Sequence, residues 1–227
     1  MIKIAIDGPS GAGKSTVSKA LAKKLGYIYV DTGAMYRAAA LGCITAEIDI
    51  KNNPERAAEM VSYMNIDIKY GDDGSQLIFL DRENVTDFIR TPEVSIGASD
   101  ISKIPEVRLK LVDIQRKLGE QSNVIMDGRD IGTYVFPDAD VKIFLTATDE
   151  ERARRRHKEL LEKGQTVTFE EVLEDMRYRD KNDSTRAFAP LKPAEDSVLV
   201  ETDGLSFEES VEKVQSIILE RLGQNAL

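Results

Sequence analysis

The chain has 227 residues, of which 41% are hydrophobic and 31% are charged. These values are typical of one folded α/β domain with an insertion, and they exclude an intrinsically disordered chain. The formal net charge of −9 argues against a nucleic-acid polymer as the main partner, because binding a phosphate backbone needs a basic surface. One cysteine and one histidine are too few for a disulfide framework or a histidine-rich metal site.

The N-terminal segment is a short apolar run at residues 2–6. It has neither the length nor the flanks of a signal peptide or a membrane span. We therefore expect a cytoplasmic protein with no membrane partner.

Strand-like runs alternate with helical patterns along the chain. The run at residues 2–6 precedes a glycine-rich turn and a helix in which Val17, Leu21 and Leu25 keep helical spacing. Further buried strands are predicted at residues 27–30, 123–126, 141–145 and 198–200. This alternation predicts a three-layer α/β fold, with a five-stranded parallel sheet and helices on both faces.

Several helix starts are marked by capping signals. Asn53 and Thr91 each precede a proline, which favours a cap followed by a first-turn proline. Capping boxes are predicted at Thr148 with Glu151, Thr168 with Glu171, and Ser206 with Glu209.

One stretch of the chain interrupts the strand–helix alternation. Residues 66–70, 76–80 and 83–85 resemble short strands joined by tight turns. They predict a small antiparallel insertion.

The lone cysteine and histidine carry no predicted chemistry. Cys43 lies in an apolar helical stretch, which indicates a small buried residue. His157 lies among basic residues, which favours a solvated helix surface.

Residues 8–15 read GPSGAGKS and match the phosphate-loop pattern G-x-x-x-x-G-K-[ST]. The match lies directly after a predicted strand and opens a predicted helix, which is the context that the motif requires. Its glycines let backbone N–H groups surround phosphate oxygens, Lys14 can neutralise the β- and γ-phosphates, and Ser15 can ligate Mg²⁺. The motif therefore predicts binding of a nucleoside triphosphate.

Two further features suit a phosphate-transferring site. Asp127 ends the strand at 123–126, where a carboxylate would face Mg²⁺. A purely structural interpretation, in which it only caps the next turn, stays open. Five arginines flank turns or helix starts around the expected carboxyl edge of the sheet, namely Arg37, Arg108, Arg129, Arg179 and Arg186.

The segment EERARRR at residues 150–156 carries four arginines in seven residues and is followed by Lys163, Gly164 and Gln165. It predicts a mobile cationic lid that excludes water from the phosphates. The alternative is an ion-paired, solvated helix face.

At this point the sequence resembles the bacterial cytidylate kinase family. The matching pieces span nearly the whole chain in order: GPSGAGKST from Gly8, DTGAMYR from Asp31, the segment around Pro105 to Arg108, DGRDIGT from Asp127, FPDA from Phe136, EERARRR, and RDKNDSTR from Arg179. The resemblance implies a P-loop nucleoside-monophosphate-kinase-like fold as a single domain, 1–227. Its core would comprise 1–63, 102–148 and 166–227, with a monophosphate-binding insert at 64–101 and a lid at 149–165.

The resemblance also implies the reaction and the residues that perform it. The family transfers the γ-phosphoryl group of ATP to CMP or dCMP in pyrimidine nucleotide metabolism and uses Mg²⁺. We expect this protein to be a monomer. ATP would bind at Gly8, Pro9, Ser10, Gly11, Ala12, Gly13, Lys14, Ser15 and Thr16. CMP would bind at Thr32, Arg37, Ser99, Arg108, Arg129, Asp130, Arg179, Asp183 and Arg186. Lys14, Arg129, Arg155 and Arg156 would be catalytic, and Ser15 and Asp127 would hold Mg²⁺, Asp127 through water.

Base recognition also has an independent chemical argument. Within the implied set, Ser99, Arg108 and Asp130 would contact the base. Cytosine presents an N4 amino donor beside N3 and O2 acceptors, so a carboxylate and a guanidinium complement it. Uracil presents an acceptor to the carboxylate and should be disfavoured.

Other functions stay open from the residues alone. The acceptor could be another monophosphate, or a hydroxyl group for which Asp130 would serve as the base. A nucleotide-switched binding protein such as a small GTPase is a further alternative, although the sequence contains no Asn-Lys-x-Asp guanine-reading motif.

Overall fold

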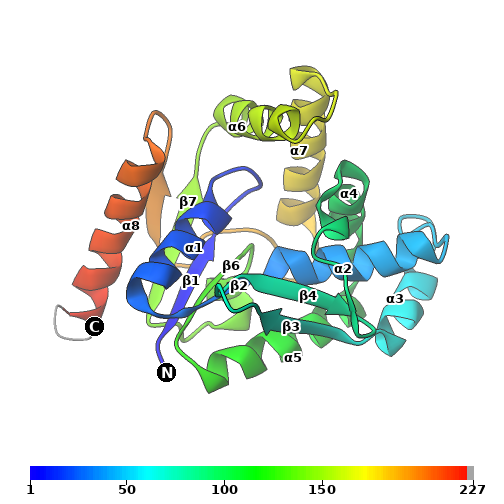
Figure 1. Ribbon diagram of the computed structural model, residues 1–227, viewed down its shortest axis with the longest axis horizontal. Coiled ribbons are helices and arrows are strands. Elements are labelled where there is room, and N and C mark those ends of the chain that lie inside the picture. The colour runs from blue at the N-terminus through cyan, green and yellow to red at the C-terminus, as the bar shows by residue number, and fades with distance from the viewer. Residues whose placement is uncertain (224–227) are drawn as a thin grey trace.

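The computed structural model describes residues 1–223 and places a five-stranded parallel sheet at the centre of the molecule (Figure 1). The strand order is β2-β6-β1-β7-β8, which confirms the predicted five-stranded parallel sheet. The strands are β1 (Lys3–Asp7), β2 (Ile28–Asp31), β6 (Val124–Gly128), β7 (Val141–Thr146) and β8 (Val198–Glu201). Every strand ends slightly later than its apolar run predicts, because backbone pairing continues through the polar residue that follows. The carboxyl edge of the sheet therefore carries several acidic side chains.

Alternate side chains of the strands point to opposite faces of the sheet, and each face has its own layer of helices. Ile4, Ile6 and Ile125 pack against α1 (Lys14–Leu25) and α8 (Phe207–Leu222). Ala5 and Met126 belong to the core on the other face, together with α2 (Thr32–Thr45) and α5 (Pro105–Gln121). The predicted three-layer architecture is confirmed.

The insertion extends the second of these cores. It follows α3 (Pro54–Tyr63) and contains the antiparallel sheet β3 (Ile66–Tyr70), β4 (Gln76–Leu80) and β5 (Glu83–Asn84), then η1 (Phe88–Arg90) and α4 (Pro92–Ile101). Its apolar side chains Ile68, Ile78 and Val94 join the cluster that contains α2. The predicted antiparallel insertion is confirmed, with a third strand that ends one residue early.

Helices α6 (Asp149–Glu162) and α7 (Phe169–Thr185) form a hairpin beside the sheet (Figure 1). Ala153, Leu160, Val172 and Met176 make a small core between them, separate from the two larger cores. The hairpin therefore depends on few apolar contacts of its own.

The prediction that His157 lies on a solvated surface is wrong. Its side chain is half-buried in the α6–α7 hairpin, with Nε2 3.0 Å from the carbonyl oxygen of Val167 and the ring edge-on to Phe169. The segment between the two helices folds back over this face of α6, which no local pattern reveals. Cys43 is buried, as its apolar surroundings predict.

The predicted caps are confirmed in part. Helices α7 and α8 begin with complete capping boxes, and Thr91 caps α4 by accepting a hydrogen bond from the backbone N–H of Val94. At α6 the box is incomplete, because the Glu151 carboxylate pairs with arginines while Asp203 accepts the Thr148 N–H instead. Asn53 makes no side-chain cap at α3.

Within residues 1–223 we find no helix with the length and apolar character needed to cross a bilayer.

Candidate active site

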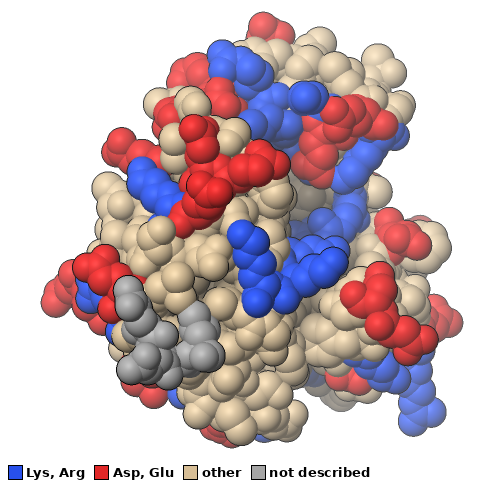
Figure 2. All heavy atoms as spheres, turned by 60° about the vertical axis from the view of Figure 1, so that its left-hand side comes forward, with Lys and Arg blue, Asp and Glu red and all other residues tan. Residues whose placement is uncertain are grey.

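A cavity of about 470 Å³ opens at the carboxyl edge of the parallel sheet. Its walls come from the loop between β1 and α1, the start of α2, the middle and C-terminal end of α4, the end of β6 with the residues after it, and the hairpin α6–α7. Figure 2 shows Lys and Arg side chains gathered in a hollow of one face, whereas Asp and Glu are spread over the surrounding surface. A local basic site thus exists on a chain whose net charge is −9.

The glycine-rich loop has the backbone that its sequence requires. Gly8, Gly11 and Gly13 all have positive φ angles, of 148°, 73° and 90°. A Cβ atom at Gly8 would overlap the carbonyl oxygen of Leu145, so the loop can pass β7 only with glycine there. The loop can therefore turn its amides towards an anion at the start of α1.

Lys14 is buried at the base of this loop. Its Nζ donates a hydrogen bond to the carbonyl oxygen of Pro9, at 2.7 Å. Burial, reinforced by the nearby Arg129 cation, lowers the pKa of Lys14 from its usual range. An anionic phosphate beside Nζ would reverse that effect by favouring the charged amine.

Ser15 and Asp127 lie together, as a magnesium site would require. Ser15 Oγ donates to Asp127 Oδ2 at 2.7 Å, and Tyr29 donates to the other carboxylate oxygen at 3.2 Å. Burial, with a contribution from Asp31, raises the pKa of Asp127. No group of three or more His, Cys, Asp or Glu side chains in the described part of the chain could hold a metal by itself. The hydroxyl and carboxylate oxygens fit Mg²⁺, which prefers oxygen ligands and is commonly shared with substrate phosphates.

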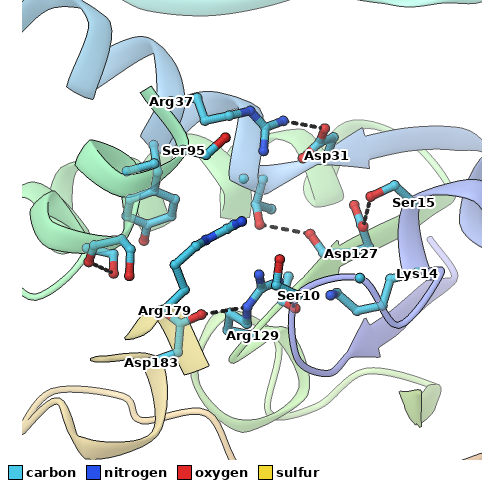
Figure 3. A pocket seen from close by; sticks show the side chains of 18 of the residues that line it. Ser10, Lys14, Ser15, Asp31, Arg37, Ser95, Asp127, Arg129, Arg179 and Asp183 are labelled. Carbon is cyan, nitrogen blue, oxygen red and sulfur yellow. Dashed lines mark hydrogen bonds and ion pairs between the residues drawn. The ribbon is translucent and has the colours of Figure 1, made fainter. Parts of the chain in front are cut away.

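Opposite the loop, Arg37 of α2, Arg129 directly after β6 and Arg179 of α7 point into the cavity (Figure 3). Arg37 pairs with Asp31 at 2.8 Å, and Arg129 Nε pairs with Asp183 at 2.8 Å. Arg186, also bordering the cavity, is 3.8 Å from Asp183.

Arg37 and Arg179 each have a buried Nε without a hydrogen-bond partner among residues 1–223. Arg37 still pairs with Asp31, whereas Arg179 makes no ion pair with a carboxylate in that part of the chain. Burial and the nearby cations Arg129, Arg37 and Arg156 together lower the pKa of Arg179 to about 10, against the effect of Asp183. A cation that is held among other cations indicates a site for an anion.

The three predicted base-reading residues all border the cavity. Arg108 Nη2 contacts Asp130 Oδ2 directly, and Arg186 lies 3.3 Å from the other oxygen of Asp130. Ser99 is buried at the C-terminal end of α4, where its hydroxyl accepts a hydrogen bond from Asn182 at 3.3 Å. Thr32, at the start of α2, donates to the carbonyl oxygen of Asp127 at 2.8 Å. Asp130 thus neutralises two arginines as well as facing the cavity.

In the arginine-rich helix α6, some arginines face the cavity, as a cationic lid requires, and others belong to an ion-paired, solvated face. Arg155 and Arg156 border the cavity, although Arg155 also donates to the Thr202 carbonyl oxygen at 2.7 Å and Arg156 pairs with Glu159 at 2.8 Å. Arg154 is 70% exposed and pairs only with Glu151 in the same helix. The cationic run therefore faces the cavity with one side and the solvent with the other.

Comparison with known proteins agrees with this geometry. The family model described as cytidylate kinase matches residues 4–220. The chain belongs to the cytidylate kinase family. A curated cytidylate kinase of Caldicellulosiruptor saccharolyticus is 55% identical over 98% of this chain and 97% of its own length. One from Clostridioides difficile is 52% identical over 95% of this chain and 97% of its own. An uncharacterised protein of Eubacterium ventriosum, 12% identical, covers 96% of this chain and 98% of its own in structure, with a TM-score of 0.50, and supports the fold alone.

In this member of the cytidylate kinase family, several residues in or near the cavity were not predicted from the sequence. Asp31 caps α2 through the backbone N–H of Ala34, and Arg90 of η1 borders the cavity 3.6 Å from Asp31. Asp7 accepts from the backbone N–H groups of Ile131 and Gly132. Asp7 and Asp31, like Asp127, directly follow the apolar run of a strand, so the same positional rule could have found them. No local signal identifies Arg90.

Proposed function

We propose that this chain transfers the γ-phosphoryl group of ATP to CMP or dCMP and releases ADP with CDP or dCDP. The observation that carries the proposal is the cluster of Arg37, Arg129 and Arg179 opposite the phosphate loop, with Arg179 lacking a partner at Nε. Two anion sites that face each other across one cavity suit a donor triphosphate and an acceptor monophosphate. The names of the close relatives support the cytidine base.

The chemistry needs no strong base. The second pKa of a phosphate monoester is near 6, so the attacking oxygen of the acceptor is already largely deprotonated at pH 7. The protein can then act by aligning two phosphates and by stabilising the charge that spreads over them, with Lys14, Arg129, Arg155 and Arg156 as the cations. Ser15 and Asp127 would hold Mg²⁺, which supplies further positive charge to the phosphates when it is bound.

The structure disfavours the alternative in which Asp130 is a base for a hydroxyl acceptor. Two arginines, Arg108 and Arg186, surround its carboxylate. Each of its two oxygens faces one of these guanidinium groups, so neither oxygen is placed to take a proton from a hydroxyl acceptor. We therefore assign it to reading N4 of cytosine.

A coupled assay of ADP release tests the proposal, with ATP, Mg²⁺ and each of CMP, dCMP, UMP, AMP and dTMP. We expect turnover to depend on added CMP or dCMP. Equal or faster turnover with UMP, AMP or dTMP would contradict the assignment of the base.

Replacing the loop lysine tests the phosphate cradle separately. Lys14→Ala should reduce kcat by at least about a hundredfold, because it removes charge that is needed in the transition state. Lys117→Ala is the control, since Lys117 is 65% exposed and pairs only with Asp113 of its own helix. Wild-type turnover by a folded Lys14→Ala variant would contradict the role of Lys14.

A further inference from the structure

Arg152 is a buried arginine, 3% exposed, at which four segments of the chain meet. Its Nε donates to the carbonyl oxygen of Ala147 at the end of β7, and its Nη2 donates to Asp149 in the first turn of α6. Its Nη1 lies 2.7 Å from the carbonyl oxygen of Ser10 in the phosphate loop and 2.6 Å from Asp180 of α7. One guanidinium thus connects the loop to both helices of the hairpin.

Asp180 contacts the same loop residue. Its Oδ1 accepts a hydrogen bond from the backbone N–H of Ser10 at 3.3 Å, while its Oδ2 pairs with Arg152. Arg152 and Asp180 together therefore bind both polar backbone groups of Ser10.

These contacts fix the orientation of two successive peptide groups. The N–H of Ser10 and the carbonyl of Pro9 belong to one planar trans peptide group, so a bond to the N–H also sets the direction of the carbonyl oxygen. That carbonyl oxygen is the acceptor for Lys14 Nζ. The next peptide group, with the carbonyl of Ser10, is held by Arg152. The direction of the loop amides, and the position of the Lys14 amine, follow from this arrangement.

Arg152 does not act on phosphate directly. All three of its nitrogens donate to protein oxygens, and two carboxylates, Asp149 and Asp180, neutralise its charge. Arg152 therefore reaches the ATP site through Ser10, which it contacts in the phosphate loop.

Packing supports the same connection between hairpin and loop. A Cβ atom added at Gly11 would lie 2.8 Å from Met176 Cε of α7 and 3.1 Å from the Arg152 carbonyl oxygen of α6. The loop therefore lies directly against both helices. These same helices carry Arg155, Arg156 and Arg179 to the cavity.

We propose that Arg152 and Asp180 are positioning residues that orient the peptide groups on either side of Ser10, and so couple ATP binding by the loop to the placement of the α6–α7 hairpin. The inference rests on the proposed function in taking ATP as the donor. It adds two residues that are not among those lining the cavity.

The test uses Arg152→Lys and Asp180→Asn, with Arg154→Lys as the matched control in the same helix. Lysine keeps the charge between the two carboxylates but cannot make the fork of hydrogen bonds. Asp180 is 21% exposed, so its variant avoids an unpaired charge in a fully dry site. The KM values for ATP and CMP, kcat, the Kd for ADP in the absence of acceptor, and Tm are measured for each.

We expect the KM for ATP and the Kd for ADP to rise on the order of tenfold in both variants, since each removes a charge-assisted hydrogen bond. The KM for CMP should stay within about twofold of the wild-type value, because the acceptor arginines are untouched. Arg154→Lys should match the wild type. In the double variant the KM for ATP should rise by much less than the product of the two single increases, because both residues act through Ser10.

Three outcomes would overturn the proposal. The first is a KM for ATP that is the same in both variants as in Arg154→Lys. The second is an increase in the KM for ATP in the double variant that equals the product of the two single increases. The third is a parallel shift of both KM values with Tm, which would mean a structural role only. Failure of the wild type to phosphorylate CMP or dCMP would contradict the proposed function instead. The Kd for ADP would still test whether Arg152 and Asp180 position the phosphate loop.

Discussion

At the scale of single residues, the site is built from pairs of opposite charge that lie far apart in the sequence. Arg129 and Asp183 are separated by 54 residues, and Arg108 and Asp130 by 22. Each carboxylate holds a guanidinium in a fixed direction before any substrate binds, which reduces the entropy lost on binding. Arg179 is the exception, because it makes no ion pair with a carboxylate among residues 1–223. This is consistent with a position where an anionic substrate takes the place of a protein carboxylate.

Asp130 should affect both specificity and stability. In Asp130→Asn, an amide donor can face the base, so the ratio of kcat/KM for CMP over UMP should fall by about tenfold or more. Its partners Arg108 and Arg186 have side chains only 1% and 2% exposed, so loss of the charge should also lower the free energy of unfolding by about 3–5 kcal/mol.

Asp113→Asn serves as the control for this substitution. Asp113 is 63% exposed and pairs with Lys117 on the surface of α5, so its change should stay within about 0.5 kcal/mol. An unchanged ratio of CMP over UMP in a folded Asp130→Asn variant would show that this carboxylate does not read N4.

At the scale of secondary-structure elements, the α6–α7 hairpin is distinguished by a small apolar core of its own. Its own core consists of four buried side chains, whereas the two cores of the central sheet are much larger. A unit of this kind can open without unfolding the sheet. Opening is useful in a kinase, because the donor must enter and the closed site must exclude water.

Leu160→Ala should loosen the hairpin selectively. Leu160 is 4% exposed in the small core, and a buried Leu→Ala change costs about 2–5 kcal/mol. We expect faster amide hydrogen exchange throughout α6 and α7, with unchanged protection in β1 and β6. The neighbouring Leu161, which is 50% exposed, provides the control Leu161→Ala and should leave exchange unaltered. Faster exchange in the central strands to the same degree would show that the hairpin is not an independent unit.

At the scale of the whole molecule, the carboxyl edge of the sheet gathers buried acids as well as cations. Burial raises the pKa of Asp7 to about 7, despite hydrogen bonds from two backbone N–H groups. Burial likewise raises the pKa of Asp127, whereas Arg37 holds the pKa of Asp31 below its usual value against the effect of burial. The stability of the protein should therefore depend on pH through these groups.

Asp7 gives a pH dependence with a defined sign. Its ordinary pKa of 3.8 applies to the unfolded chain, so between about pH 4 and pH 7 the folded state binds more protons than the unfolded state. The contribution of Asp7 to the free energy of unfolding is therefore largest below pH 4 and falls as the pH rises to about 7. Asp7→Asn removes this dependence, so urea denaturation should show a larger loss of stability from the substitution at pH 5 than at pH 8.

Asp138→Asn is the control for this titration, because Asp138 is 72% exposed and pairs only with Lys3. Its effect on stability should vary little between pH 5 and pH 8. A loss in Asp7→Asn that is equal at both pH values, or larger at pH 8, would mean that Asp7 is already ionised in the folded protein.

Local patterns in the sequence were enough to predict the parallel sheet, the antiparallel insertion, the phosphate loop and the helix starts at Thr168 and Ser206. These features depend on spacing within about ten residues, which fixes the backbone locally. The packing of the folded chain was needed to show which charges meet, as in the contact of Arg152 with Ser10 across 142 residues. It was also needed to show the half-buried position of His157 and the place of Arg90 in the cavity wall. Such contacts depend on how whole elements pack, and a charged residue on a helix carries no local signal that separates a buried partner from solvent.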